Sequence, residues 1–281
     1  MIKNKKKYLI LFSILMVMLL SISYDFEPSE DNIGVIEIKG TIMDSKDIIK
    51  SLDEFNNRSD IKSIILRLDT PGGAVAPSQE IYEKVKAISF QNKKPIIASI
   101  SSVAASGGYY IAIGADEIIA NPGSITGSIG VIINFPIARE LVDKVGLKFN
   151  TVKSGKMKDA GSPYRNPTDD ENVFFQEIVN DLHSQFVKEV SVQRNLNIDK
   201  LSSMTDGRIF TGKQAYELGL IDSIGTFEDA LNISKNLANI SGSTNLVYPK
   251  DKKGGLIKML FDESKIWLNT MDNIPMYLYN N

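Results

Sequence analysis

The sequence predicts an α/β protein in which helices cover a mostly parallel sheet and one apolar segment precedes the globular part. Short apolar runs alternate along the chain with segments whose apolar residues recur at helical spacing, as in parallel strands joined by helices. Hydrophobic residues make up 43% of the 281 residues and charged residues 23%, which is typical of a soluble globular protein. This composition excludes a disordered, a collagen-like and a polytopic membrane chain.

The N-terminal segment has the features of a membrane-targeting sequence. Four lysines precede an apolar run from Tyr8 to Ile22 that contains no charge, proline or glycine. The run is slightly shorter than the ~20 residues that span a bilayer, a difference that tilt or local thinning accommodates. The lysines predict a cytoplasmic N-terminus and an exported body. Residues 1–24 are therefore either a signal anchor, which we favour and which contacts the membrane through residues 8–24, or a cleaved signal peptide.

Either interpretation places the rest of the chain on the outer face of the membrane. We divide it into a globular domain over residues 25–249 and a tail over residues 250–281. The tail differs in character because a lysine- and glycine-rich start precedes two short amphipathic stretches. An oligomer contact, a membrane-surface helix and a partly disordered end are all open interpretations of it.

The first half of the globular domain predicts three strands, each followed by a helix. The strands are the apolar runs over 33–38, 61–68 and 95–101. The helices lie over 45–56, 77–88 and 104–114. The first has apolar residues at i, i+3 and i+4 spacing, and the second carries a proline in its first turn, where proline is tolerated.

The second half predicts shorter strands and longer helices. Further strands are expected over 117–120, 128–133 and 147–152. Helices are expected over 136–145, 168–193, 211–218 and 227–240. The longest of them starts with three acidic residues, which interact favourably with the helix dipole, and Gly219 ends the next one.

Composition restricts the chemistry that the protein can perform. The chain has no cysteine, which excludes disulfide scaffolds, thiolate zinc sites, iron–sulfur clusters and cysteine nucleophiles. Its one histidine, His183, lies inside the predicted long helix with no acid placed to orient it, so a Ser-His-Asp triad is not expected. The net charge is −2 overall and −6 without the lysine-rich first 24 residues, which disfavours nucleic acid as a partner.

Three glycine-rich turns follow predicted strands. They are Asp69–Gly73, Ala104–Tyr110 and Thr126–Gly130, and each taken alone is more typical of an ordinary turn or helix cap. Ser106, in the second turn, would expose its hydroxyl beside free N–H groups that can stabilise an oxyanion. A serine nucleophile needs a base, and a desolvated lysine can serve. Residues 153–158 contain three lysines, among which composition does not choose.

Taken together and in order, the motifs resemble the short form of the signal peptide peptidase A family. They are Asp-Thr-Pro-Gly-Gly, Ala-Ser-Gly-Gly-Tyr-Tyr, Thr-Gly-Ser-Ile-Gly-Val, Lys-Ser-Gly-x-x-Lys-Asp and Asp-Gly-Arg-Ile-Phe-Thr-Gly-x-Gln-Ala, within residues 31–240. The resemblance implies a membrane-anchored Ser-Lys endopeptidase with the layered ββα fold that Clp protease and crotonases share. It also implies homo-oligomers, no cofactor, and signal peptides and other apolar peptides as substrates.

The resemblance assigns roles to individual positions. Ser106 matches the nucleophile, Lys158 the general base, and Ser128 the serine that positions the lysine. Gly73 and Gly107 match the turns whose N–H groups form the oxyanion hole, and Gly72 supports the first turn.

Three rival functions fit the same residues less well. A stomatin-cleaving membrane protease would use the same serine and lysine. A crotonase-type acyl-CoA hydratase or isomerase would use carboxylates and cytosolic substrates. A membrane-anchored scaffold of this fold would not need intact catalytic residues.

Overall fold

The computed structural model describes residues 16, 31–91, 94–250 and 276–278. The predicted membrane segment and most of the tail lie outside these ranges. Within the described ranges, no helix combines the length and apolar character that crossing a bilayer requires. The predicted boundaries at residues 24 and 249 therefore stay predictions.

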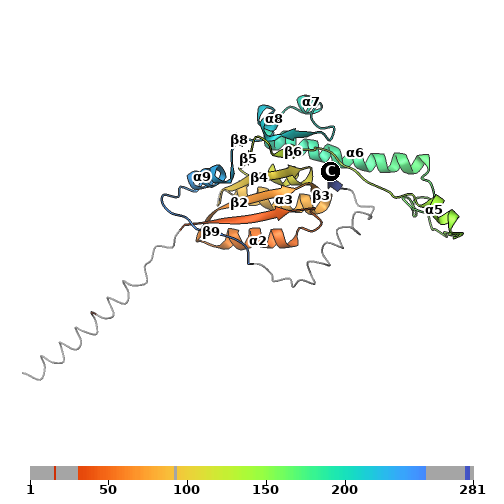
Figure 1. Ribbon diagram of the computed structural model, residues 1–281, viewed down its shortest axis with the longest axis horizontal. Coiled ribbons are helices and arrows are strands. Elements are labelled where there is room, and N and C mark those ends of the chain that lie inside the picture. Colours follow the sequence, from red (N-terminus) through yellow and green to blue (C-terminus); the bar gives the residue numbers. More distant parts are fainter. Residues whose placement is uncertain (1–15, 17–30, 92–93, 251–275, 279–281) are drawn as a thin grey trace, which may run out of the picture.

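Three long parallel strands form the centre of an eight-stranded sheet (Figure 1). These strands are β1 (Asn32–Lys39), β2 (Ile61–Thr70) and β4 (Ile96–Ala105). Strand β4 pairs with β5 (Glu117–Ala120) along its first half and with β6 (Ile125–Gly127) along its second. The edge strands are β7 (Ile209–Thr211), β8 (Ser223–Ile224) and β9 (Leu246–Val247). The mixed α/β class that the sequence predicts is confirmed.

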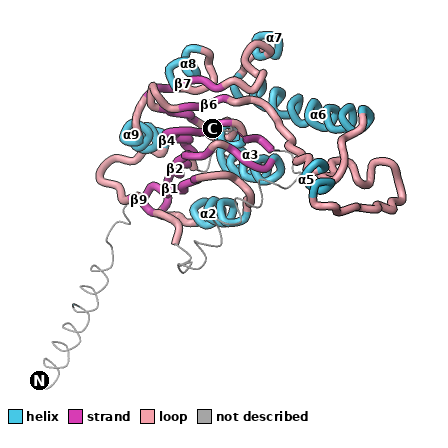
Figure 2. Tube along the Cα trace, turned by 45° about the vertical axis from the view of Figure 1, so that its right-hand side comes forward, coloured by secondary structure: helices cyan, strands magenta, loops and turns pink. Residues whose placement is uncertain are grey.

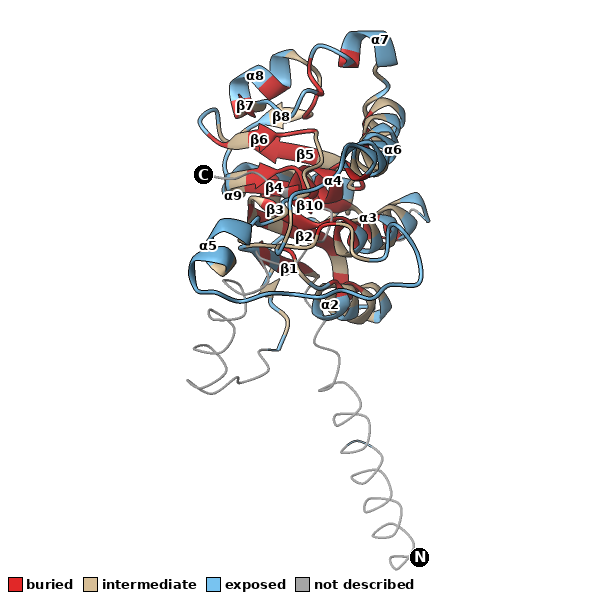
Figure 3. Ribbon diagram, turned by 90° about the vertical axis from the view of Figure 1, so that its right-hand side faces the viewer, coloured by how far each residue is buried: buried red, intermediate tan, exposed pale blue. Residues whose placement is uncertain are grey.

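Helices cover both faces of this sheet, which explains why its central strands are apolar almost without interruption. One face packs against α2 (Lys46–Asn57), α3 (Val75–Phe90), α4 (Gly107–Ala112) and α6 (Asp169–Arg194). The other packs against α9 (Phe227–Leu237). Successive side chains of β2 point to opposite faces of the sheet: Ile64 and Leu66 pack into the larger hydrophobic core on the first face, and Ile65 packs into the smaller core under α9. Figure 3 shows the buried strands between exposed outer helices.

A second, two-stranded sheet lies at the carboxyl end of β2. Strand β3 (Gly72–Ala74) pairs antiparallel with β10 (Met276–Leu278), which comes from the end of the chain. The pattern of apolar residues in the sequence predicts neither β3 nor β10. The small helices α7 (Ile198–Leu201), beside α6, and α8 (Gly212–Glu217), beside β7, complete the fold.

Residues 133–167, which we call the arm, project beyond the sheet and include α5 (Arg139–Lys144) (Figure 2). The predicted strand over 147–152 is wrong, because these residues are exposed and pair with no strand in the described part of the chain. The strand predicted over 128–133 is displaced to β6, since Gly127 and Ser128 take positive φ angles that end it. Helix α4 starts three residues later than predicted, because Ala104 and Ala105 still belong to β4.

Candidate active site

Ser106 occupies the junction between β4 and α4. Its φ of +52° and ψ of −114° are unusual for a residue with a side chain. The backbone is held there because its N–H donates to the Gly127 carbonyl (2.7 Å) and its carbonyl accepts from the Tyr110 N–H (2.9 Å). The predicted exposure of the Ser106 hydroxyl is wrong, because the residue is 1% exposed and its Oγ is buried, with no hydrogen-bond partner among the described residues. Backbone strain and an unpartnered buried hydroxyl in one residue are typical of a functional site.

The first glycine turn places backbone amides next to Ser106. Thr70 Oγ1 accepts from the Gly72 N–H (3.1 Å) and donates to the Gly40 carbonyl (2.6 Å), which fixes the turn. The Ile42 N–H then donates to the Gly72 carbonyl (2.8 Å), and the Ile42 carbonyl accepts from the Ala74 N–H (2.7 Å). Because neighbouring residues of a strand direct their amides to opposite edges, the Gly73 amide faces away from Ile42, toward β10.

Only glycines keep the space between these amides open. A Cβ on Gly107 would lie 2.5 Å from Ser78 Oγ and 3.2 Å from the Gly73 nitrogen. A Cβ on Gly72, which has a φ of +102°, would lie 2.7 Å from the Gly107 nitrogen. The amides of Gly73 and Gly107 thus border one small space. Convergent N–H groups of this kind can stabilise the oxyanion of a tetrahedral intermediate.

Ser128 lies beside Ser106 at the end of the neighbouring strand. Ala105 of β4 pairs with Gly127 of β6, and each serine directly follows one of these paired residues, which makes the two serines neighbours. Ser128 also has a φ of +52°, is 6% exposed and donates its N–H to the Arg208 carbonyl (2.8 Å). The structure therefore brings together five of the six residues that the sequence suggests: Gly72, Gly73, Ser106, Gly107 and Ser128.

Lys158 is the residue that the structure does not bring to the others. It is exposed in the arm, and it makes no hydrogen bond with Ser106 Oγ. The structure does distinguish the three lysines of this loop. Lys153 pairs with Asp159 and Lys156 with Asp170, whereas the Lys158 ammonium has no hydrogen bond or ion pair with a described residue.

The alternative catalytic groups are not in place. His183 lies half-buried on α6, and its Nε2 has no hydrogen-bond partner within the described ranges. It therefore does not contact the Ser106 hydroxyl. In the same ranges, no group of three or more His, Cys, Asp or Glu side chains could hold a metal ion.

The C-terminal strand β10 lies across the site, which sequence reasoning missed. Met276 exchanges two backbone hydrogen bonds with Ile132 (3.0 and 3.1 Å), and β3 pairs on the other side. A Cβ on Gly72 would lie 2.2 Å from the Tyr277 carbonyl oxygen, so this carbonyl borders the same space as the Gly107 amide. A three-residue strand that pairs about 200 positions away leaves no periodic signal that could have predicted it.

Tyr277 fills an aromatic pocket next to the site. The residue is fully buried, and its ring stacks on Tyr110 with centroids 5.3 Å apart and lies 4.8 Å from the ring of Phe186. Its hydroxyl donates to the Leu182 carbonyl (3.2 Å). Burial raises the pKa of Tyr110 to about 12.

Comparison with known proteins identifies relatives that are named as proteases. Residues 88–241 match the model of peptidase family S49. A candidate protease of Synechocystis is 42% identical over 210 residues, which cover 74% of this chain and 75% of that protein. A candidate signal peptide peptidase of Enterococcus faecium is 36% identical over 79% of this chain and 64% of its own length. A chloroplastic serine protease of Arabidopsis thaliana is 32% identical over 80% of this chain, which spans 32% of that protein.

Proposed function

The chain belongs to peptidase family S49 and is a serine protease, and we propose that Ser106 is its nucleophile, Lys158 its general base and cleaved signal peptides its substrates. The observation that carries this proposal is the strained, buried Ser106, whose Oγ has no described partner and lies next to two glycine turns. The Enterococcus relative, which is named for signal peptides, supports the substrate class.

The arrangement suggests a sequence of steps. Ser106 Oγ attacks the scissile carbonyl while neutral Lys158 accepts its proton, with Ser128 positioning the lysine amine nitrogen. The N–H groups of Gly73 and Gly107 donate to the oxyanion. Lys158 then protonates the leaving amine, and water hydrolyses the acyl-enzyme by the same route. No cofactor takes part in these steps.

We infer that the base reaches Ser106 from a second copy of the chain. Lys158 is exposed on the arm, which projects away from the sheet (Figures 1 and 2). The arm also exposes large apolar side chains: Ile137, Leu141, Val145, Leu147, Phe149 and Val152. Exposed apolar surface of this kind supports self-association, and a homo-oligomer would cover it and deliver Lys158 to a neighbouring site.

The path of β10 supports a mode of peptide binding. A substrate in this path would add a strand between β3 and Ile132, with backbone hydrogen bonds on both sides, as Met276–Leu278 does. A large apolar side chain could then occupy the pocket of Tyr277. Apolar peptides such as signal sequences match this pocket.

We also infer the location and the finer fold class from the sequence. Residues 8–24 would anchor the chain with its N-terminus in the cytoplasm and its catalytic body outside the membrane, because four lysines precede the apolar run. The glycine turns at the ends of parallel strands support the layered ββα fold of Clp protease and crotonases.

Hydrolysis of a quenched apolar peptide by the full chain in detergent, between pH 6 and 10, tests the proposal. Ser106→Ala and Lys158→Ala are expected to be inactive and folded, whereas Lys156→Ala, the matched control from the same loop, keeps its activity. Mixing the two inactive variants is expected to restore activity if the base comes from another copy. Full activity of Ser106→Ala, or equal losses in both lysine variants, would overturn the assignments.

A further inference from the structure

The loop that carries Lys158 is built from consecutive turns and is tied to α6 by charged side chains. Backbone hydrogen bonds join Lys158 to Gly155 (3.1 Å), Ala160 to Met157 (3.2 Å) and Ser162 to Asp159 (3.1 Å). Turns alone leave such a loop free to rotate as a unit. Two side chains of the loop connect it to α6: Lys156 pairs with Asp170, and Asp159, next to Lys158, pairs with Arg165.

Arg165 connects Asp159 to the start of α6. Its Nε donates to Asp159 Oδ2 (3.0 Å), and its Nη2 donates to the Asp159 carbonyl (3.0 Å). The same guanidinium donates from Nη1 to Glu171 Oε2 (2.8 Å) and from Nη2 to Glu171 Oε1. With a further bond from Nη1 to the Asn166 carbonyl (3.1 Å), one planar group thus holds two carboxylates and two carbonyls, a geometry that a lysine cannot reproduce.

Glu171 is a rigid attachment point. Its side chain is 3% exposed, and it closes a capping box in which Oε2 accepts from the Thr168 N–H (2.9 Å) and Thr168 Oγ1 accepts from the Glu171 N–H (3.3 Å). Asp159 is 15% exposed and also accepts from Lys153. The hydrogen bonds from Arg165 hold the pKa of Glu171 at about 2, so the pair stays ionised at neutral pH.

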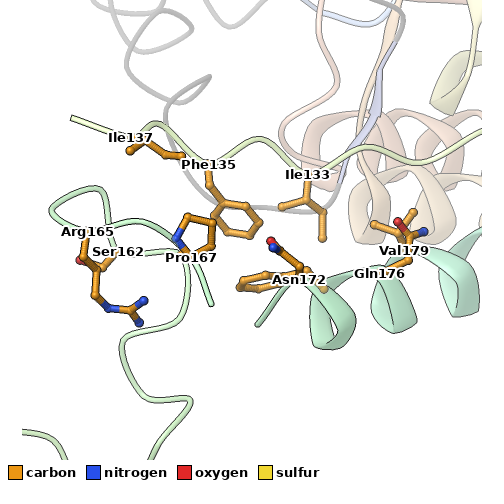
Figure 4. A pocket seen from close by; sticks show the side chains of 11 residues that line it. Ile133, Phe135, Ile137, Ser162, Arg165, Pro167, Asn172, Gln176 and Val179 are labelled. Atoms are coloured by element: carbon orange, nitrogen blue, oxygen red, sulfur yellow. The ribbon is translucent and has the colours of Figure 1, made fainter. Parts of the chain in front are cut away.

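Apolar contacts seat the arm on the same helix. The rings of Phe135 and Phe175 have centroids 4.1 Å apart, and they line a cavity of about 280 Å³ between the arm and α6. Figure 4 shows Arg165 at one end of this cavity and Val179 at the other. The arm is therefore fixed to α6 by aromatic packing at one point and, at the loop that carries Lys158, by the Arg165 ion pairs and the exposed Lys156–Asp170 pair.

We propose that Arg165 is a positioning residue for the catalytic base: by joining Asp159 to Glu171, it sets the direction in which the Lys158 side chain projects from the arm. This inference rests on the proposed role of Lys158. In this inference Asp159, which follows Lys158, anchors the loop and takes no part in proton transfer. The loop delivers Lys158 to its serine only while the guanidinium holds both carboxylates.

The test compares Arg165→Met, Arg165→Lys and Asp159→Asn in the full chain with a matched control, Arg58→Met, which breaks the ion pair with Asp60 far from the arm. Misplacement of the base by about 1 Å lowers kcat by about a hundredfold. We expect losses of this size in all three arm variants, with KM unchanged, and wild-type kcat in the control. Guanidinium ion added to Arg165→Ala is expected to restore part of the lost kcat, because it replaces the hydrogen bonds to Asp159 and Glu171.

The possible results separate this inference from the proposed function. Wild-type kcat in folded Arg165→Met, together with inactive Ser106→Ala and Lys158→Ala, overturns the positioning role alone. Full activity of Ser106→Ala overturns the proposed function itself. If Arg165→Met does not fold, Asp159→Asn decides, and wild-type kcat in that variant overturns the inference.

Discussion

The substitution Gly107→Ala tests the oxyanion hole through a single methyl group. The new Cβ would lie 2.5 Å from Ser78 Oγ, so the Ser78 side chain must rotate and give up its hydrogen bond to the Ala74 carbonyl (2.9 Å). That loss costs about 1 kcal/mol of stability, equivalent to a decrease in Tm of about 2–4 °C. The same Cβ would lie 3.2 Å from the Gly73 nitrogen, where it obstructs an oxyanion approaching that N–H group.

The effect on catalysis should therefore exceed the effect on stability. Removal of one oxyanion donor lowers kcat by about 10²–10³-fold, equivalent to about 2.7–4 kcal/mol. Steady-state hydrolysis of the quenched peptide and thermal unfolding measure the two effects separately. The double variant Ser78→Ala/Gly107→Ala removes the contact with Oγ but keeps the obstruction, so we expect the Tm of Ser78→Ala and a kcat that is still low.

Gly123→Ala is the matched control, because a Cβ there would have no neighbour within 4 Å. It should leave both kcat and Tm unchanged. A folded Gly107→Ala with a kcat within about threefold of wild type would refute the assignment of this space to the oxyanion.

Three further predictions follow from strain, charge and the C-terminal strand. Ser106→Gly should be inactive but have a Tm a few degrees higher than Ser106→Ala in thermal unfolding, because glycine relieves the positive φ of +52°. Arg165 holds the pKa of Glu171 at about 2, below its usual 4.5, so ionised Glu171 stabilises the fold fully above pH 4.5 and progressively less as the pH falls toward 2. Glu171→Gln should therefore unfold more easily than wild type at pH 7, with a difference that shrinks in acid-unfolding curves; a constant difference would contradict this. A chain without residues 276–281 should show a higher kcat/KM for short peptides, because it vacates the path beside β3, and an unchanged value would mean that substrates bind elsewhere.

The sequence predicts the central strands well because helices bury both of their faces. The runs over 33–38, 61–68 and 95–101 are apolar for that reason, and all three lie in the structure as expected. The segment 147–152 fails for the opposite reason. Three of its six residues are apolar, yet Leu147, Phe149 and Val152 are exposed on the arm, where no described strand pairs with them.

The candidate site is predictable where short motifs fix the backbone and unpredictable where it depends on distant contacts. The glycine turns follow from local sequence, because the positive φ of Gly72 and the close backbone approach at Gly73 and Gly107 require glycine. The three lysines of residues 153–158 are equivalent by composition. Only the ion pairs of Lys153 with Asp159 and of Lys156 with Asp170 distinguish them from Lys158.

Covalent labelling of the full chain with a serine-reactive fluorophosphonate, followed by mass spectrometry of the modified peptide, tests the central claim most directly. A serine nucleophile activated by a lysine predicts one adduct, on Ser106, that forms in native but not in unfolded protein and forms much more slowly in Lys158→Ala. An adduct on another serine, or a labelling rate that is the same in Lys158→Ala, would contradict the account.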